Sequence, residues 1–208
     1  LAVVRSVLES VEKCSNEEER NHFLHLMSEE TVHMKRLIDD MLLLANSDAD
    51  TLTIKPEACQ PDLLLLDTYE KFEPLAKKNG LHLILTLPEE ILPDCFCDIH
   101  RTEQIFSIIV DNALCYTPSG GKVTLSCHAE NEMLCFLFED TGCGISEEKK
   151  SHIFERFYRA DDAHTDREHF GLGLCIAKEL TEKQNGNIQV VDAPISGSCF
   201  IVQLPCAL

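Results

Sequence analysis

The chain has 208 residues, 44% of them hydrophobic, which suffices for one ordinary domain with an appendage or for two small domains. Its formal net charge of −18, from 36 acidic and 18 basic residues, argues against a nucleic-acid or anionic-lipid partner, because phosphate contacts need clustered Lys and Arg. No apolar run approaches the roughly 18 residues that indicate a membrane span, and the first residues lack a signal-peptide pattern.

Residues 16–45 contain neither Gly nor Pro, and their apolar side chains recur every three, four or seven positions. This spacing predicts one long amphipathic helix, capped by Ser15 or Asn16. Residues 1–12 have a similar pattern and are predicted to end an earlier helix. Because two such helices cannot bury their apolar stripes alone, we expect residues 1–48 to be a partial helical hairpin that forms a homodimer. Packing of the stripe on the following domain is the alternative.

A polar break at residues 46–50 is a predicted hinge. After it, helical and alternating patterns mix over residues 49–208, and we expect one α+β domain, a two-layer α/β sandwich with helices on one face of a sheet. The predicted strands are 52–55, 81–87, 121–129, 132–139, 188–192 and 198–204. The predicted helices are 62–78, 100–116, 147–160 (at least at its start) and 171–184, with a polar loop at 161–169.

The eleven cysteines are scattered from Cys14 to Cys206 without a CxxC pair. Cys95 and Cys97 are the only close pair, and on a strand they would point to one face, but two thiolates alone do not make a zinc site. We therefore expect free thiols that behave as small hydrophobic residues in a reducing cytoplasm, and we disfavour structural metal or disulfide use.

Two glycine turns are the most informative feature of the chain: Asp140-Thr-Gly-Cys-Gly-Ile145 and Gly171-Leu-Gly-Leu174. Glycine lets a backbone pass close to a ligand and adopt positive φ. A carboxylate just before such a turn can accept a hydrogen bond from a base or a sugar. With the Asn-bearing helix upstream, at residues 104–116, these turns predict a nucleotide pocket.

In order and spacing, these segments resemble the conserved boxes of sensor histidine kinases from two-component systems. Residues 104–118 resemble the Asn box, residues 140–145 the first glycine box, and Ile153-Phe-Glu-Arg-Phe-Tyr-Arg159 the phenylalanine box. Residues 171–174 resemble the second glycine box, and residues 197–200 the terminal strand signature. The resemblance covers residues 50–208 and implies the Bergerat-type ATP-binding fold, which gyrase, mismatch-repair and chaperone ATPases share.

The resemblance implies ATP and Mg²⁺ as cofactors and assigns a role to each matching residue. Asn112 would be the metal ligand through its side-chain oxygen, Asp140 would accept from the adenine amino group, and Tyr116 would lie against the ring. The full implied cofactor-binding set is Asn112, Tyr116, Asp140, Gly142, Gly144, Ile145, Gly171, Leu172, Gly173, Leu174 and Ser198. A core position is the alternative for Tyr116.

Other roles follow from the same resemblance. Gly171 and Gly173 open a helix whose backbone N–H groups can face phosphates, and Ser198 would hold a water against the base. Arg159, or Arg156, would be the catalytic residue that stabilises charge on the γ-phosphate, with a solvated salt bridge as the equal alternative for either. Residues 161–169 would form a lid over the nucleotide.

The chain departs from the family at Ile108, where an Asn is common, at Cys115, where a basic residue is common, and at His169, where a Gly is common. None of the nine histidines has the acid and proline that follow the family's phosphoacceptor. Residues 1–5 look like the sequence just after that proline, so we expect the acceptor to lie upstream of this chain.

The implied function is the catalytic part of a sensor histidine kinase, which transfers the γ-phosphoryl group of ATP to a His for relay to a response-regulator Asp. The expected partners are a response-regulator receiver domain and a second copy, joined through the N-terminal helices. We expect a cytoplasmic location, with any membrane attachment through N-terminal regions that this sequence lacks. An ATP-binding scaffold without transfer activity is the alternative.

Overall fold

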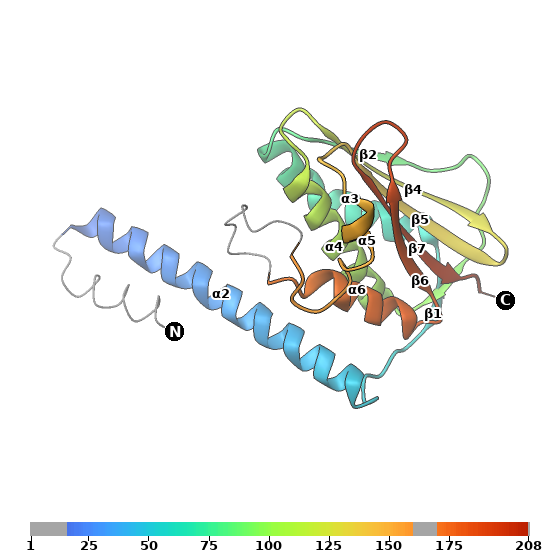
Figure 1. Cartoon of the computed structure of the whole chain (residues 1–208), viewed down its shortest axis with the longest axis horizontal. Helices are drawn as coiled ribbons and strands as arrows, with labels where there is room; N and C mark the ends of the chain where they lie inside the picture. The colour runs from blue at the N-terminus through green and yellow to red at the C-terminus, as the bar shows by residue number, and fades with distance from the viewer. Residues whose placement is uncertain (1–15, 160–169, 208) are drawn as a thin grey trace.

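The computed structural model describes residues 16–159 and 170–207, so the helix expected over 1–12 and the loop expected over 161–169 lie outside it. The expected long helix is present as α2 (Glu17–Asp48), whose N-terminal half extends away from the rest of the molecule (Figure 1). Asn16 caps it by accepting from the Glu18 backbone N–H at 3.0 Å, and three acidic residues stabilise its first turn.

A five-stranded sheet forms the centre of the remaining chain, in the strand order β2-β4-β5-β7-β6. The β2–β4 pair is parallel and the other pairs are antiparallel. The bounds are β2 (His82–Thr86), β4 (Lys122–Glu130), β5 (Met133–Asp140), β6 (Asn187–Asp192) and β7 (Ser198–Pro205).

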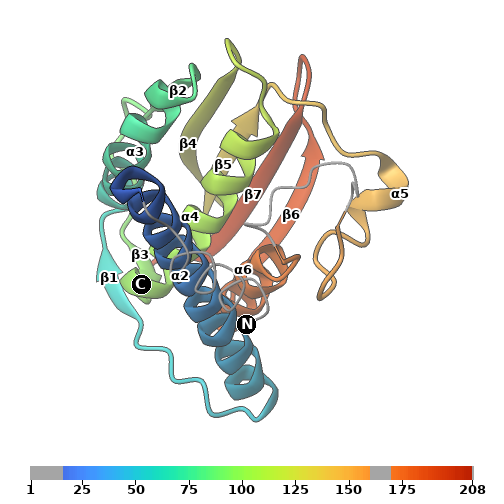
Figure 2. The same ribbon diagram turned by 90° about the vertical axis from the view of Figure 1, so that its left-hand side faces the viewer.

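Three helices cover one face of this sheet: α3 (Pro61–Lys78), α4 (Ile99–Tyr116) and α6 (Gly173–Glu182) (Figure 2). The core lies between the two layers, because alternate strand residues point toward the helices. Phe106 on α4 contacts Phe136 and Phe138 of β5, with ring centroids 4.9 and 5.0 Å apart. The predicted two-layer α/β sandwich is therefore confirmed.

One local prediction was wrong. Residues 52–55 form no strand, and the extended pairing comes later, where β1 (Glu57–Cys59) pairs antiparallel with β3 (Cys95–Cys97). Pro56, which lacks an N–H, separates the two segments, and the Lys55 N–H binds the Asp98 carboxylate at 2.9 Å instead of a strand.

Two predicted helices are present, and the structure sets their bounds. Helix α5 (Glu147–Lys150) has a single turn and is followed by further turns. Helix α6 begins at Gly173, because Gly171 has a φ of +73°, in the left-handed region that no right-handed helix contains.

The C-terminal end of α2 is fixed to the sheet domain by polar contacts. Arg156 binds the Asp48 carboxylate with both terminal nitrogens, at 2.6 and 2.7 Å. The Ser47 hydroxyl donates to Glu179 on α6 at 2.7 Å, and Lys183 pairs with Asp50. These contacts set the position of α2 beside α4 and α6.

The apolar residues of α2 divide between two faces. Leu43 and Leu44 are buried against the sheet domain, whereas Ile38 and Met41, from the predicted stripe, are 53% and 45% exposed. Contact with the domain therefore accounts for Leu43 and Leu44 but leaves this part of the stripe uncovered. Among the helices that the structure describes, none has the length and hydropathy that a membrane crossing requires.

The Arg156–Asp48 contact gives a testable prediction. In an Asp48→Asn variant, the bidentate ion pair is lost, so we expect faster amide exchange at the end of α2 and an unchanged melting temperature, because the pair is exposed. Hydrogen exchange with mass spectrometry measures this directly. Asp39→Asn is the control, because it removes the charge of an exposed aspartate on the same helix. Equal amide exchange in both variants would show that the ion pair does not fix the end of α2.

Candidate functional site

A cavity of about 110 Å³ opens between the C-terminal half of α4, the end of β5 and the start of β7. Nine residues of the predicted site line it: Asn112, Tyr116, Asp140, Gly144, Ile145, Arg159, Gly171, Leu174 and Ser198. They come from five segments that are separated along the chain. The structure thus brings most of the predicted set around one space.

Among the residues that the structure describes, Asp140 is the only carboxylate that lines this cavity, and it is 5% exposed. Its Oδ1 accepts from the Gly142 N–H at 2.7 Å, and Ser198 donates to it through both its N–H and its hydroxyl. Burial raises the pKa of Asp140, and these hydrogen bonds oppose that rise. The carboxyl is thereby fixed as an acceptor at the cavity wall.

Two glycines let the backbone approach Asp140 closely. A Cβ on Gly142 would lie 2.5 Å from the Tyr116 carbonyl oxygen, and one on Gly197 would lie 2.6 Å from Asp140 Oδ1. Gly142 therefore supports the site from behind instead of lining it. Gly197 belongs to the terminal strand signature, but we did not predict it as a site residue, because its role depends on contact with a distant strand.

A second cavity, of about 370 Å³, lies between α2, α3, α4 and the start of α6. Asn112 and Leu174 line both cavities, so the two spaces adjoin each other at these residues. The first cavity alone is smaller than the roughly 300–1,000 Å³ typical of ligand pockets, and the two together fall within that range. Leu172 and Gly173, also predicted site residues, line the second cavity at the N-terminus of α6.

Asn112 stands at the junction with a fixed orientation. Its side-chain nitrogen donates to the Ile108 carbonyl at 2.7 Å, one turn earlier on α4. The remaining amide group, Oδ1, is the hard neutral oxygen that Mg²⁺ accepts as a ligand. Asp111 and Asp40 also line the adjoining cavity. The oxygen of Asn112 suits a hard divalent cation that takes its other ligands from phosphate and water.

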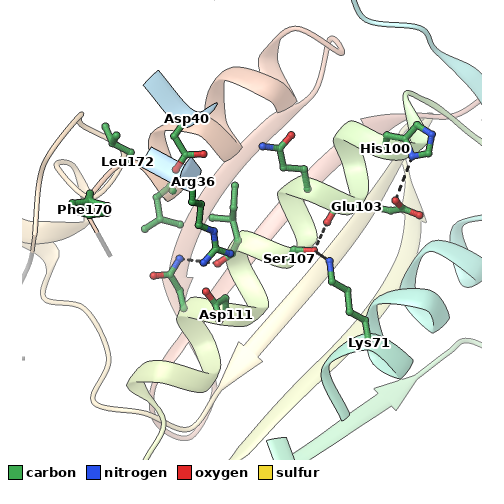
Figure 3. A pocket seen from close by; sticks show the side chains of 14 residues that line it. Arg36, Asp40, Lys71, His100, Glu103, Ser107, Asp111, Phe170 and Leu172 are labelled. Carbon is green, nitrogen blue, oxygen red and sulfur yellow. Dashed lines mark hydrogen bonds and ion pairs between the residues drawn. The ribbon is translucent and has the colours of Figure 1, made fainter. Parts of the chain in front are cut away.

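Residues that sequence reasoning missed line the second cavity. Arg36 and Asp40 extend into it from α2, and Lys71 reaches it from α3, where its amine donates to Ser107 at 2.9 Å (Figure 3). The sequence pattern misses them because periodicity assigns them only to the polar faces of two helices. Arg36 and Lys71 are visible in the sequence as basic residues, but only the packing of α2 and α3 beside α4 brings both to one cavity.

The two candidate arginines are placed differently. Arg159 lines the first cavity, at the end of the described segment that precedes residue 160. Arg156 lines neither cavity, and its guanidinium binds Asp48 instead. For Arg156 the structure thus has the salt bridge that was the alternative to a catalytic role.

Two of the three departures from the family pattern lie within the described residues. Ile108 lines the second cavity, and its Cγ2 lies 3.2 Å from the place that a Cβ on Gly173 would occupy, so it packs α4 against α6. Cys115 is exposed at the end of α4. His169 lies outside the described residues.

Comparison with known proteins identifies the family of the chain. Residues 97–208 match the family described as histidine kinase-, DNA gyrase B- and HSP90-like ATPase, and the chain belongs to this family. It is 32% identical over 187 residues to the adaptive-response sensory kinase SasA of Rippkaea orientalis, covering 89% of the chain and 47% of that protein. It is 33% identical over 185 residues to the sensor protein SrrB of Staphylococcus aureus, covering 88% of the chain and 31% of that protein.

Solved structures of histidine kinases have the same fold. A full-length ShkA structure with AMPPNP superposes with a TM-score of 0.80 at 26% identity, covering 95% of this chain and 41% of that one. The histidine kinase ThkA in complex with the response regulator TrrA superposes with a TM-score of 0.76 at 18% identity, covering 99% of this chain and 57% of that one, a likeness of fold. The domain is an ATP-binding catalytic domain of the histidine-kinase type. The chain spans between about a third and about half of the curated relatives it matches.

Proposed function

We propose that the chain binds Mg·ATP across the two adjoining cavities and is the catalytic part of a two-component sensor kinase. The observation that carries this proposal is the buried Asp140 acceptor in the first cavity, with Asn112 where that cavity meets the second. The adenine would donate its amino group to Asp140, beside Tyr116. The triphosphate would then pass Asn112 toward the N-terminus of α6.

Mg²⁺ would supply charge neutralisation for the phosphates, held on the protein side by Asn112 Oδ1. The chain's own residues bind and orient the nucleotide. Gly171, Leu172, Gly173 and Leu174 bring backbone N–H groups toward the phosphates at the start of α6, and Arg159 would balance charge on the γ-phosphoryl group. Phosphoryl transfer of this kind depends mainly on positioning and electrostatics, so a pocket without a nucleophile of its own suffices.

In the parent protein, the γ-phosphoryl group would pass to a phosphoacceptor histidine, and from there to an aspartate of a receiver domain. The complex of ThkA with a response regulator supports a partner of that type. The exposed Ile38 and Met41 support pairing of α2 with a second copy. We further propose that the parent protein is a membrane-attached sensor with this part on its cytoplasmic side. The similarity to the sensor protein SrrB supports this proposal.

Calorimetric titration with a non-hydrolysable ATP analogue tests the proposed function. We expect one binding site and at least tenfold tighter binding with Mg²⁺ than with EDTA, because Asn112 would hold the metal and the metal would neutralise phosphate charge. Absence of binding at millimolar analogue would contradict the proposal. Binding without any phosphoryl transfer to a supplied fragment with an intact acceptor histidine would favour the ATP-binding scaffold instead.

A further inference from the structure

Three cysteines from two distant segments meet on the small β1–β3 ribbon. Cys59 lies directly opposite Cys95 in the antiparallel register, and Cys97 is opposite Glu57, two residues from Cys59. All three side chains therefore point to one face of the ribbon. On that face Cys95 and Cys97 are fully buried, whereas Phe96, on the other face, is 44% exposed.

The three sulfur atoms are close enough to bind one ion. All lie within 4.8 Å of one another, and the Sγ atoms of Cys59 and Cys97 are 3.4 Å apart. With a Zn–S bond of about 2.3 Å, a tetrahedral or trigonal ion holds its sulfur ligands roughly 3.8–4.0 Å apart. Small side-chain rotations therefore turn this cluster into a coordination site. A disulfide would need two sulfurs at about 2.05 Å, a much larger approach.

The surroundings also favour a cation. Asp94 and Asp98 flank β3 and place negative charge beside the sulfurs. Cys59 is only partly buried, so an ion can reach the cluster from solvent. No residue of the cluster lines either nucleotide cavity. The cluster is therefore separate from the proposed ATP site.

We propose that Cys59, Cys95 and Cys97 form a trithiolate site for a thiophilic d¹⁰ cation of the Zn²⁺ type. The fourth coordination position would be open to water or to an external ligand. The sequence pattern disfavours a metal, because it shows only the Cys95–Cys97 pair. The third ligand comes from β1, and only strand pairing reveals it.

The site lies where the linker from α2 enters the domain. Cys59 follows that linker closely, and Cys97 directly precedes Asp98, the N-cap of α4. Asp98 already accepts from the Lys55 N–H at 2.9 Å and from the Arg101 N–H at 3.1 Å. A bound ion would therefore tie the entering chain to the start of the helix that carries Asn112.

The test uses the whole chain, purified under reductant and without oxygen, and Zn²⁺ as the probe. Competition with a chromophoric chelator measures affinity, and Co²⁺ substitution reports thiolate ligands through charge-transfer absorption. We expect one equivalent of Zn²⁺ and a higher melting temperature with Zn²⁺. Cys59→Ser and Cys97→Ser should each weaken Zn²⁺ binding at least tenfold, because each removes a thiolate ligand.

Two variants serve as controls. Cys143→Ser changes an exposed thiol and Cys199→Ser a buried thiol outside the cluster, and both should bind Zn²⁺ as the unmodified chain does. Cys59→Ser is the decisive variant, because its partly exposed position lets the fold persist, which circular dichroism checks. Three results would each overturn the proposal. They are binding of much less than one equivalent of Zn²⁺, the same Zn²⁺ affinity in Cys59→Ser as in the unmodified chain, and a Cys59–Cys97 disulfide that persists under reductant.

Discussion

Replacing Asn112 with alanine is expected to abolish the dependence of ATP binding on Mg²⁺ while the fold stays intact. The substitution removes the Asn112 side-chain oxygen, which stands at the junction of the two cavities, and the hydrogen bond that fixes its orientation. The metal would then bind through the nucleotide alone. We expect the affinity with Mg²⁺ to fall at least tenfold, to about the level measured in EDTA.

Calorimetric titration with and without Mg²⁺ checks this result. Asn187→Ala, at the exposed start of β6, is the control, because it removes the same side chain far from the cavities. An alanine substitution in a helix interior should itself be tolerated, since alanine has the highest helix propensity. Unchanged Mg²⁺-dependent affinity in Asn112→Ala would exclude Asn112 as the metal ligand.

An Asp140→Asn variant is expected to lose adenine recognition. A hydrogen bond to a charged group contributes about 1.5–3 kcal/mol, which corresponds to roughly 10–150-fold in affinity. The Asp140 carboxylate also accepts from Gly142 and Ser198. In the variant, the amide NH₂ group cannot accept from these donors, so one of them loses its partner. Guanine has a carbonyl where adenine has its amino group, so the preference for ATP over GTP should shrink as well.

Titration of the variant with ATP and GTP analogues measures both effects. Glu139→Gln is the matched control, because Glu139 precedes Asp140 on the same strand and points to the opposite face. Equal loss in both variants would indicate a general disturbance of β5 instead of a lost acceptor.

The ionisation of Asp140 adds a pH dependence to this prediction. Its pKa in the folded protein is raised by burial, so the protonated form is favoured relative to an exposed aspartate. As the pH falls through that raised pKa, Asp140 loses its charge and ATP binding weakens. This loss should begin at a higher pH than for an ordinary aspartate. The same shift makes folding more favourable below the unfolded pKa, and that contribution disappears as the pH rises through the folded pKa.

The local pattern of the sequence determined much of this protein. The apolar periodicity of α2, the alternation in β4 and β5 and the order of the glycine turns depend on neighbouring residues, so they can be read along the chain. Nine of the residues that line the first cavity were predicted from the resemblance of local segments to the histidine-kinase boxes. The glycine turns by themselves indicated only a nucleotide pocket. The strand expected at residues 52–55 failed because its composition resembles a strand but no partner lies beside it.

Tertiary structure alone decided the contacts between segments distant in sequence. Packing of α2 and α3 beside α4 brings Arg36 and Lys71 to one cavity. The ion pair with Asp48 takes Arg156 away from the nucleotide cavity. The pairing of β1 with β3 adds Cys59 to a cysteine pair that looked insufficient for a metal. Each of these contacts depends on which surfaces meet, and a period of two or 3.6 residues specifies only the face of an element, not its partner.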